Sequence, residues 1–165
     1  MQVIDYKVGR IVPIEMKEQY KVGQVLFLPQ PKINPDYSER KLMIENIFED
    51  VRKTVFPHLP SRQSSLFVFP IDDVKYEEEW LNILYPHQNA EYVLLTLSLT
   101  GELLWFDSDF YNECQLYSNN IPKLQEQASQ YWKPIEDYLG LPQIEGLFIG
   151  TAIVENIEVK TRYQD

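Results

Sequence analysis

The stretch from residue 44 to residue 80 constrains the fold more than any other part of the chain, because it holds a helix signal and a strand signal with a defined boundary between them. From 44 to 55, apolar residues recur at three- and four-residue steps, the period of one face of an amphipathic helix. Pro57 and Pro60 end that helix, since proline lacks the amide proton that a helix interior needs. A polar turn then leads into a strand-forming run at 65–69. This stretch predicts a helix that returns directly to a buried strand.

Three helices are predicted, each preceded by a residue that can accept a hydrogen bond from its first turn. Asp36 or Ser38 caps the first, which ends near Phe56; Asp72-Asp73 caps the second, which ends near Tyr85; and Asn120 caps the third, which has Pro122 in its first turn and ends before Pro134. Residues 30–36 contain two prolines and predict a loop.

The remaining apolar segments favour strands. Residues 3–12 predict an early strand, and a brief one follows at 25–28. Leucines alternate with polar residues in the segment 91–106, the period of a strand, and Thr100-Gly101 predicts a turn or bulge that divides it into two. The last apolar segment predicts one or two closing strands, broken near Glu155-Asn156.

The irregular alternation of helices and strands favours an α+β class with small, mostly antiparallel sheets over a doubly wound sheet. A chain of 165 residues is most simply one domain spanning residues 1–165. No apolar run has the roughly 20 residues that span a bilayer, and the first residues lack the apolar core of a signal peptide. We therefore expect a cytoplasmic protein without a membrane segment.

The net charge of −10 limits the partners. A chain with this charge repels a phosphate backbone, so non-specific binding of nucleic acid is not expected. An acidic surface suits a basic protein partner, and it also simply keeps a protein in solution.

The common catalytic and metal-binding motifs are absent. The sequence has no glycine-rich phosphate loop, nucleophile elbow or zinc-protease motif, and its single cysteine, Cys114, provides too few thiols for a disulfide framework or a structural zinc site. Cys114 is expected to be a small buried or half-buried residue. His58 and His87 share no metal-ligand spacing and are expected to be loop residues.

Acidic residues offer two further candidates, each with an ordinary explanation. Asp107 and Asp109 could hold a cation or act as a base, but turn chemistry explains them equally well. The run of glutamates at 77–79 predicts a solvated helix face.

Five segments in order carry a resemblance. They are Tyr6-Lys7-Val8-Gly9-Arg10, the Phe-Pro-x-x-Pro-Ser-Arg run that ends at Arg62, Trp80, the Ala-x-x-Tyr-Trp run 128–132, and the Ile-Glu-Gly run at 144–146. Together they resemble an uncharacterised bacterial family whose members open with a Tyr-His-Val-Thr-like strand. The layout is in turn similar to the ADP-ribosyltransferase superfamily, including the small rifampin-modifying transferases.

The resemblance to ADP-ribosyltransferases implies an NAD site and a role for several residues. Glu145 heads a strand as the catalytic glutamate does in that superfamily, and it would stabilise the oxocarbenium-like cation that forms when the nicotinamide bond breaks. The residues implied for the cofactor are Tyr76 or Trp80 for nicotinamide, Arg62 or Arg10 for pyrophosphate, and Tyr6, Lys7 and Ser64 around them.

The sequence also departs from that superfamily, and alternatives stay open. Lys7 stands where a histidine is expected, so the chain could instead be a catalytically inactive binding protein of immunity or antitoxin type that masks a basic partner, or a protein that binds another nucleotide. Each residue also has a structural interpretation. Glu145 could be a surface residue, Trp80 a core anchor, and Arg62 the partner of a carboxylate such as Glu49.

Overall fold

The computed structural model describes residues 1–27, 38–139, 141 and 143–163. The strands are β1 (Gln2–Pro13), β2 (Val25–Phe27), β3 (Leu66–Pro70), β4 (Ala90–Asp107) and β5 (Ile144–Arg162). The helices are η1 (Ile14–Gln19), α1 (Glu39–Val55), α2 (Val74–Leu84), α3 (Asp109–Asn112), η2 (Glu113–Leu116) and α4 (Ile121–Tyr131), where η marks a 3-10 helix. The predicted α+β class is confirmed, and the observed strand pairs are antiparallel.

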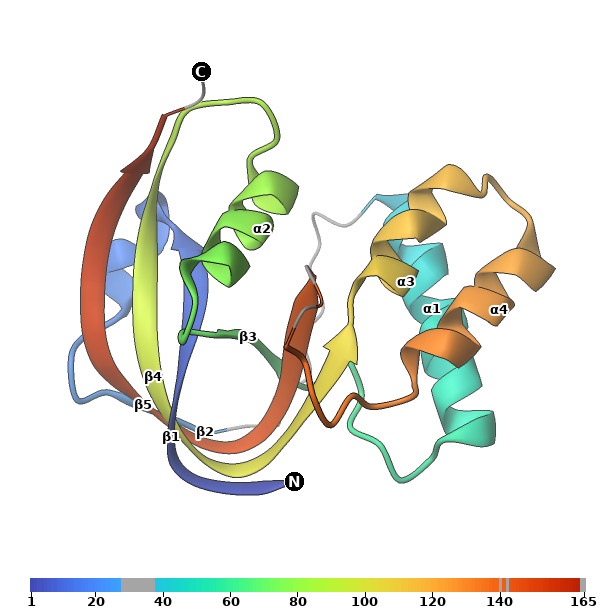
Figure 1. Cartoon of the computed structure of the whole chain (residues 1–165), viewed down its shortest axis with the longest axis horizontal. Coiled ribbons are helices and arrows are strands. Elements are labelled where there is room, and N and C mark those ends of the chain that lie inside the picture. Colours follow the sequence, from blue (N-terminus) through green and yellow to red (C-terminus); the bar gives the residue numbers. More distant parts are fainter. Residues whose placement is uncertain (28–37, 140, 142, 164–165) are drawn as a thin grey trace.

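The strands form one sheet that closes on itself. The order is β2-β5-β3-β1-β4, and β4 pairs with β5 as well, along the whole length of both strands. β3 bridges the opening, because Phe69 lies beside Gly9 of β1 while Phe67 lies beside Leu147 of β5. Figure 1 shows β4 and β5 as two long strands that curve together beneath α2. A single closed sheet thus replaces the several small sheets that the sequence predicts.

The division of this segment into two strands at Thr100-Gly101 is wrong, because β4 runs through it without a break. The irregularity at this point lies in the pairing with β1, whose register shifts between Val3 and Tyr6. Gly101 lies directly opposite Gly150 of β5, and both have positive φ, 150° and 147°. A Cβ at Gly101 would be 2.4 Å from the carbonyl oxygen of Ile149, so only glycine fits there. Two facing glycines let the strand pair bend tightly while it stays hydrogen-bonded. The register between β4 and β5 shifts between Thr96 and Leu97 of β4. No residue of β4 therefore lies opposite Glu155, and the break predicted in β5 is a bulge.

Three of the helices begin where the sequence predicts. Ser38, Asp73 and Asn120 each accept a hydrogen bond from the first turn of the helix that follows. The prediction of Asp36 as a cap and of a loop at 30–36 lies outside the described residues. The short helices α3 and η2 were not predicted, because they are too short to show a helical period.

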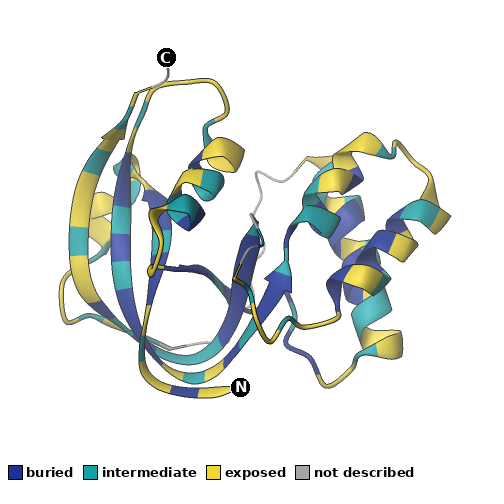
Figure 2. Ribbon diagram, in the orientation of Figure 1, coloured by how far each residue is buried: buried dark blue, intermediate teal, exposed yellow. Residues whose placement is uncertain are grey.

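The apolar core has two parts. One fills the closed sheet and includes Val8, Leu95 and Leu97, and the other lies among α1, α3 and α4 and includes Phe48 and Trp132. In Figure 2 the buried residues follow the inner surfaces of both parts. The indole of Trp132 donates to the carbonyl of Phe48 at 2.8 Å, which fixes α4 against α1. We call this second part the helical cluster. Within the described residues, no helix is both long and apolar enough to cross a membrane.

Candidate functional site

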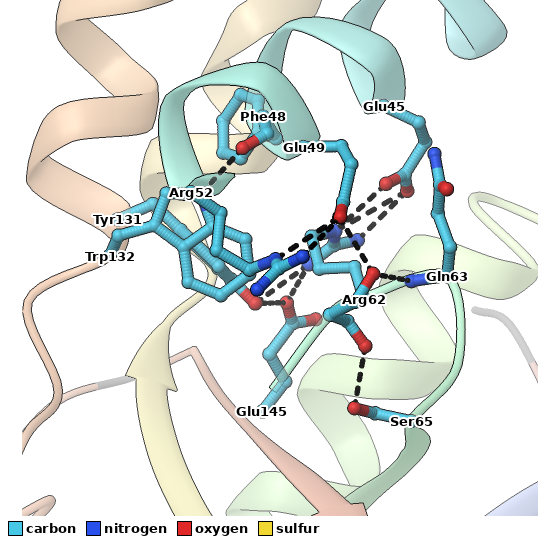
Figure 3. A network of polar contacts seen from close by, with 11 residues as sticks. Glu45, Phe48, Glu49, Arg52, Arg62, Gln63, Ser65, Tyr131, Trp132 and Glu145 are labelled. Atoms are coloured by element: carbon cyan, nitrogen blue, oxygen red, sulfur yellow. Dashed lines mark hydrogen bonds and ion pairs between the residues drawn. The ribbon is translucent and has the colours of Figure 1, made fainter. Parts of the chain in front are cut away.

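A buried arginine joins the helical cluster to the sheet (Figure 3). Arg62 lies in the polar turn between α1 and β3 and is 6% exposed. Its Nε and Nη2 both donate to the carboxylate of Glu45, each at 3.1 Å, in the two-pronged geometry that a guanidinium favours. Its Nη1 donates to the hydroxyl of Tyr131 at 2.8 Å and to Oε1 of Glu145. One side chain thereby connects α1, α4 and the start of β5.

The same arginine is enclosed by aromatic rings. Its guanidinium carbon lies 3.9 Å from the centre of the Tyr111 ring, 4.8 Å from that of Phe67 and 5.1 Å from that of Tyr131. Burial alone would lower the pKa of Arg62, but the nearby charges of Glu145 and Glu45 outweigh it and hold the pKa well above its usual value. Arg62 therefore carries its charge permanently inside the protein.

Glu145 is part of this network and is 8% exposed. The hydroxyl of Tyr131 donates to its Oε1 at 2.6 Å, and the same oxygen accepts from Arg62. Burial raises the pKa of Tyr131 well above its usual value, and the neighbouring Glu145 adds to the shift, so this hydroxyl keeps its proton and remains a donor. Two residues that the sequence singled out separately, Glu145 and Arg62, are thus bound directly to each other.

The structural interpretation of Arg62 as the partner of a carboxylate is confirmed, but the residue named for it, Glu49, is wrong. Glu49 pairs instead with Arg52, one turn along the same helix, and accepts from the hydroxyl of Ser61 at 2.6 Å. Burial raises the pKa of Glu49, but the hydrogen bonds from Arg52 and Ser61 lower it further, so the net shift is downward.

Glu45 and Tyr131 are the two members of the network that the sequence did not identify. Glu45 precedes Glu49 by one helical turn, and Tyr131 belongs to the Ala-x-x-Tyr-Trp run, so both carried a detectable signal.

Three other predicted cofactor residues lie near one another in an aromatic group on the sheet side. Trp80 is half-buried, packs on Phe69 and donates through its indole to the carbonyl of Ile144 at 3.2 Å, next to Glu145 in the chain.

Tyr76 and Tyr6 belong to the same aromatic group through Tyr138. Tyr76 is buried and meets the ring of Tyr138 edge-on. Tyr138 is hydrogen-bonded to Tyr6 and donates to Asp72. Among the described residues, the hydroxyl of Tyr76 has no hydrogen-bond partner although it is buried.

The remaining predicted residues have other surroundings. Lys7, whose side chain is 46% exposed, forms an ion pair with Glu155 at 2.9 Å. Arg10 donates to the backbone carbonyl of Phe67 at 2.9 Å. Ser64 is half-buried in the polar turn, where its amide donates to the carbonyl of Ser61. Neither the Lys7–Glu155 pair nor the bond from Arg10 to Phe67 involves Glu145 or Arg62.

A hollow of about 400 Å³ lies elsewhere, between α2 and the outer ends of β4 and β5. Its walls include Glu77, Asn82, Tyr92, Lys160 and Arg162, and none of the predicted site residues lines it. Glu77 accepts from Tyr92 at 2.6 Å and pairs with Lys160 at 3.0 Å, so this glutamate is held in place rather than freely solvated as predicted.

Three carboxylates from separate elements, Glu79, Asp107 and Glu113, act electrostatically on the carboxyl group of Asp109. Burial raises the pKa of Asp109, and the charges of Asp107, Glu113 and Glu79 raise it further. The pKa of Asp107 is also raised, again mainly by burial, although its carboxylate accepts from the backbone amide of Asp109 at 3.0 Å. Within the described part of the chain, none of the four forms an ion pair. We call these four residues the carboxylate cluster.

In the ranges that the structure describes, no group of three or more histidine, cysteine or acidic side chains is arranged to hold a metal ion. Cys114 is a buried free thiol, as predicted, and burial raises its pKa to about 11.

The side chains described above can do two things chemically. The carboxylate cluster can attract cationic groups, and Arg62 holds the two parts of the core together.

A family model described as "Protein of unknown function (DUF2441)" matches residues 32–159, most of the chain. The chain belongs to this family. The match includes Arg62, Ser64, Tyr76, Trp80 and Glu145 and leaves Tyr6, Lys7 and Arg10 outside. No curated protein matches the chain.

Proposed function

We propose that this protein acts by binding a basic protein partner and that Glu145 is not a catalytic group. The observation that carries this proposal is that the carboxylate of Glu145 is already bound within the protein. A glutamate that stabilises a developing cation must face the substrate with its charge available. Here Oε1 of Glu145 already accepts from Arg62 and Tyr131 inside the protein. The charge that would serve catalysis is neutralised by an arginine.

The carboxylate cluster is the surface that would bind the partner. Like charges repel one another. Burial is the largest cause of the raised pKa of Asp109, and repulsion by Asp107, Glu113 and Glu79 raises it further. A lysine or arginine of a partner placed among the four carboxylates would remove the repulsion. The net charge of −10 would also attract a basic protein from a distance and increase the association rate.

A pull-down that compares two variants of equal charge tests this proposal. In the first, the cluster is neutralised with Glu79→Gln, Asp107→Asn, Asp109→Asn and Glu113→Gln. In the control, four glutamates elsewhere are neutralised, namely Glu15, Glu18, Glu91 and Glu102. We expect the wild type and the control to retain a basic protein that salt releases, and the cluster variant to lose it. Equal retention by both variants would contradict the proposal.

A second candidate function is the binding of NAD or another nucleotide, as the resemblance to ADP-ribosyltransferases implies. The unpartnered hydroxyl of Tyr76 favours it, because a buried hydroxyl without a partner is costly unless a ligand or water satisfies it. Tyr6 and Trp80, two aromatic residues that the resemblance assigns to the cofactor, are half-buried against the same apolar cluster as Tyr76.

Thermal unfolding with and without NAD separates the two candidates. A ligand that binds only the folded state stabilises it by about 2.7 kcal/mol at a concentration of one hundred times its Kd. If NAD binds, its addition at millimolar concentration raises the Tm of the wild type and of Glu145→Gln alike, while Trp80→Ala abolishes the shift. If the Tm of the wild type does not change and no nicotinamide is released, the binding of NAD is excluded.

A further inference from the structure

Among the strands that the structure describes, the last part of β5, residues 155–162, forms an open edge of the sheet. One side of this segment pairs with the beginning of β4, from Ala90 to Thr96. On the other side, β2 pairs only with Thr151 to Ile153, and the last backbone bonds are those of Val154 with Gly23 and Gln24. Beyond Val154, no described residue pairs with the outer side of β5. Figure 1 shows this part of β5 at the margin of the sheet, with β4 between it and α2.

An open edge of this length is a template for pairing, because its outward amides and carbonyls are not used within the sheet. Proteins usually protect such an edge with a proline, a bulge or an inward-pointing charge. Here the bulge at Glu155 comes at the beginning of the segment, and the residues after it contain no proline. Figure 2 shows the segment as exposed or half-buried along its length.

The side chains of this edge are complementary to themselves. Val159 is 45% exposed, and the residue before it is Glu158 while the residue after it is Lys160. When two copies of the strand run antiparallel with Val159 opposite Val159, Glu158 of each copy lies opposite Lys160 of the other. In the same register Ile157 lies opposite Thr161, so one face carries apolar contacts and the other carries charge pairs.

We propose that two copies of this protein associate through β5, edge to edge and antiparallel, with the two-fold axis at Val159. Such an interface uses the same surface on both copies and closes after two, as a symmetric dimer requires. Lys160 pairs with Glu77 of α2 in its own chain, 3.0 Å away, so its ammonium must turn outward from α2 (Figure 1) to meet Glu158 of the other copy. The two negative net charges oppose association, so the attraction must come from these local pairs and from the backbone bonds.

The first experiment measures mass and amide protection against concentration. Sedimentation velocity of the full chain should show a monomer at low concentration and a dimer as concentration rises through the micromolar range. The amides on the outer side of 155–162 should exchange more slowly as the dimer forms, because they become hydrogen-bonded. A chain that stays monomeric at millimolar concentration overturns the proposal.

The second experiment identifies the register by charge reversal. Glu158→Lys and Lys160→Glu each place like charges opposite one another in the dimer, so each should weaken self-association by at least roughly tenfold. An equimolar mixture of the two variants should form a heterodimer, because both facing pairs are then opposite in charge. Glu102→Lys is the control, since it makes the same charge change as Glu158→Lys at an exposed position outside the edge, and it should leave the dimer intact.

Lys160→Glu also loses the pair with Glu77, so Val159→Lys provides a variant that does not depend on it. It places two ammonium groups at the two-fold axis and should also abolish the dimer. A dimer that survives Val159→Lys and Glu158→Lys must use another surface, and this would overturn the proposal. Because the edge does not include the carboxylate cluster, an experiment that contradicts the dimer would leave the proposed function intact.

Discussion

The Arg62 network and the carboxylate cluster treat negative charge in opposite ways. In the network, two glutamates are buried, and one arginine enclosed by rings forms an ion pair and hydrogen bonds with both of them. In the cluster, three carboxylates act on the charge of Asp109, and no arginine or lysine is paired to any of the four among the described residues. Satisfying a buried charge fixes an architecture, whereas leaving like charges together costs stability and provides attraction for a cation. We therefore assign the network to folding and the cluster to the proposed binding of a partner.

Among the substitutions that test this comparison, we expect the largest loss of stability from the removal of Arg62. Arg62→Met leaves Glu45 and Glu145 buried without a counter-charge, which should lower the free energy of unfolding by about 3–5 kcal/mol. Chemical denaturation measures the change. Arg52→Met is the matched control on the more exposed pair with Glu49, and it should cost about 1–2 kcal/mol. Equal costs for the two variants would mean that the buried network is not what joins the helical cluster to the sheet.

Glu145→Gln tests the same network more gently. The side-chain amide introduced by this substitution keeps a carbonyl that can accept from Tyr131, while the charge facing Arg62 is lost. Glu45 continues to neutralise the arginine, so the expected loss is about 1–3 kcal/mol with the fold retained. Circular dichroism and denaturant titration are the measurements. A stability equal to that of the wild type would return Glu145 to the candidates for a catalytic role, because functional residues often cost stability rather than supply it.

The sequence predicted the local features of the fold better than the long-range ones. Ser38, Asp73 and Asn120 were identified as caps because a capping bond joins residues that are neighbours in the chain. The continuity of β4 was missed because it depends on Gly150, which faces Gly101 only after the strands pair. The local sequence shows a glycine at 101, but it does not show that the backbone of Ile149 and Gly150 lies against it.

The candidate site shows the same limit. Arg62 was singled out from its turn, yet its partner was assigned to Glu49 rather than Glu45. The two glutamates lie one turn apart on the same helix face. Arg52 of the same helix pairs with Glu49, and Arg62 pairs with Glu45. Glu145 was connected with Arg62 by resemblance alone, because 83 residues separate the two in the chain. The local sequence holds no information on this contact, which follows from how the turn before β3 packs against the start of β5.

Tyr76→Phe sharpens the comparison by removing a buried polar group that has no partner among the described residues. If the hydroxyl of Tyr76 is unsatisfied in the folded protein, its loss should be neutral or should raise stability by up to about 1 kcal/mol. Tyr131→Phe is the opposite case, since that hydroxyl bonds both Arg62 and Glu145 and its loss should lower stability. Thermal unfolding of the two variants should therefore shift in different directions. A loss of stability in Tyr76→Phe would indicate that a bound group satisfies the hydroxyl.

The smallest expected effect is the pH dependence of the carboxylate cluster, and its sign separates the cluster from the network. The pKa of Asp109 is raised by burial and then by its acidic neighbours, so the folded protein holds this proton more tightly than the unfolded chain does. Its contribution to stability is full below the ordinary pKa of about 3.8 and is lost as pH rises through the raised value. Glu49, whose net pKa is lowered, contributes in the opposite sense and loses stability as pH falls.

Asp109→Asn removes the repulsion at neutral pH and should raise the free energy of unfolding by about 0.5 kcal/mol, a value discounted for solvent screening. The gain should disappear as pH falls toward the ordinary pKa of the carboxyl group, because the wild-type side chain is then protonated as well. Exposed Asp50→Asn is the control and should show little change at either pH. Denaturant titrations at neutral and acidic pH measure both. A stabilisation that persists at acidic pH would mean that charge repulsion is not what Asp109 contributes, and the contrast between a satisfied network and a repelling cluster would fail at that residue.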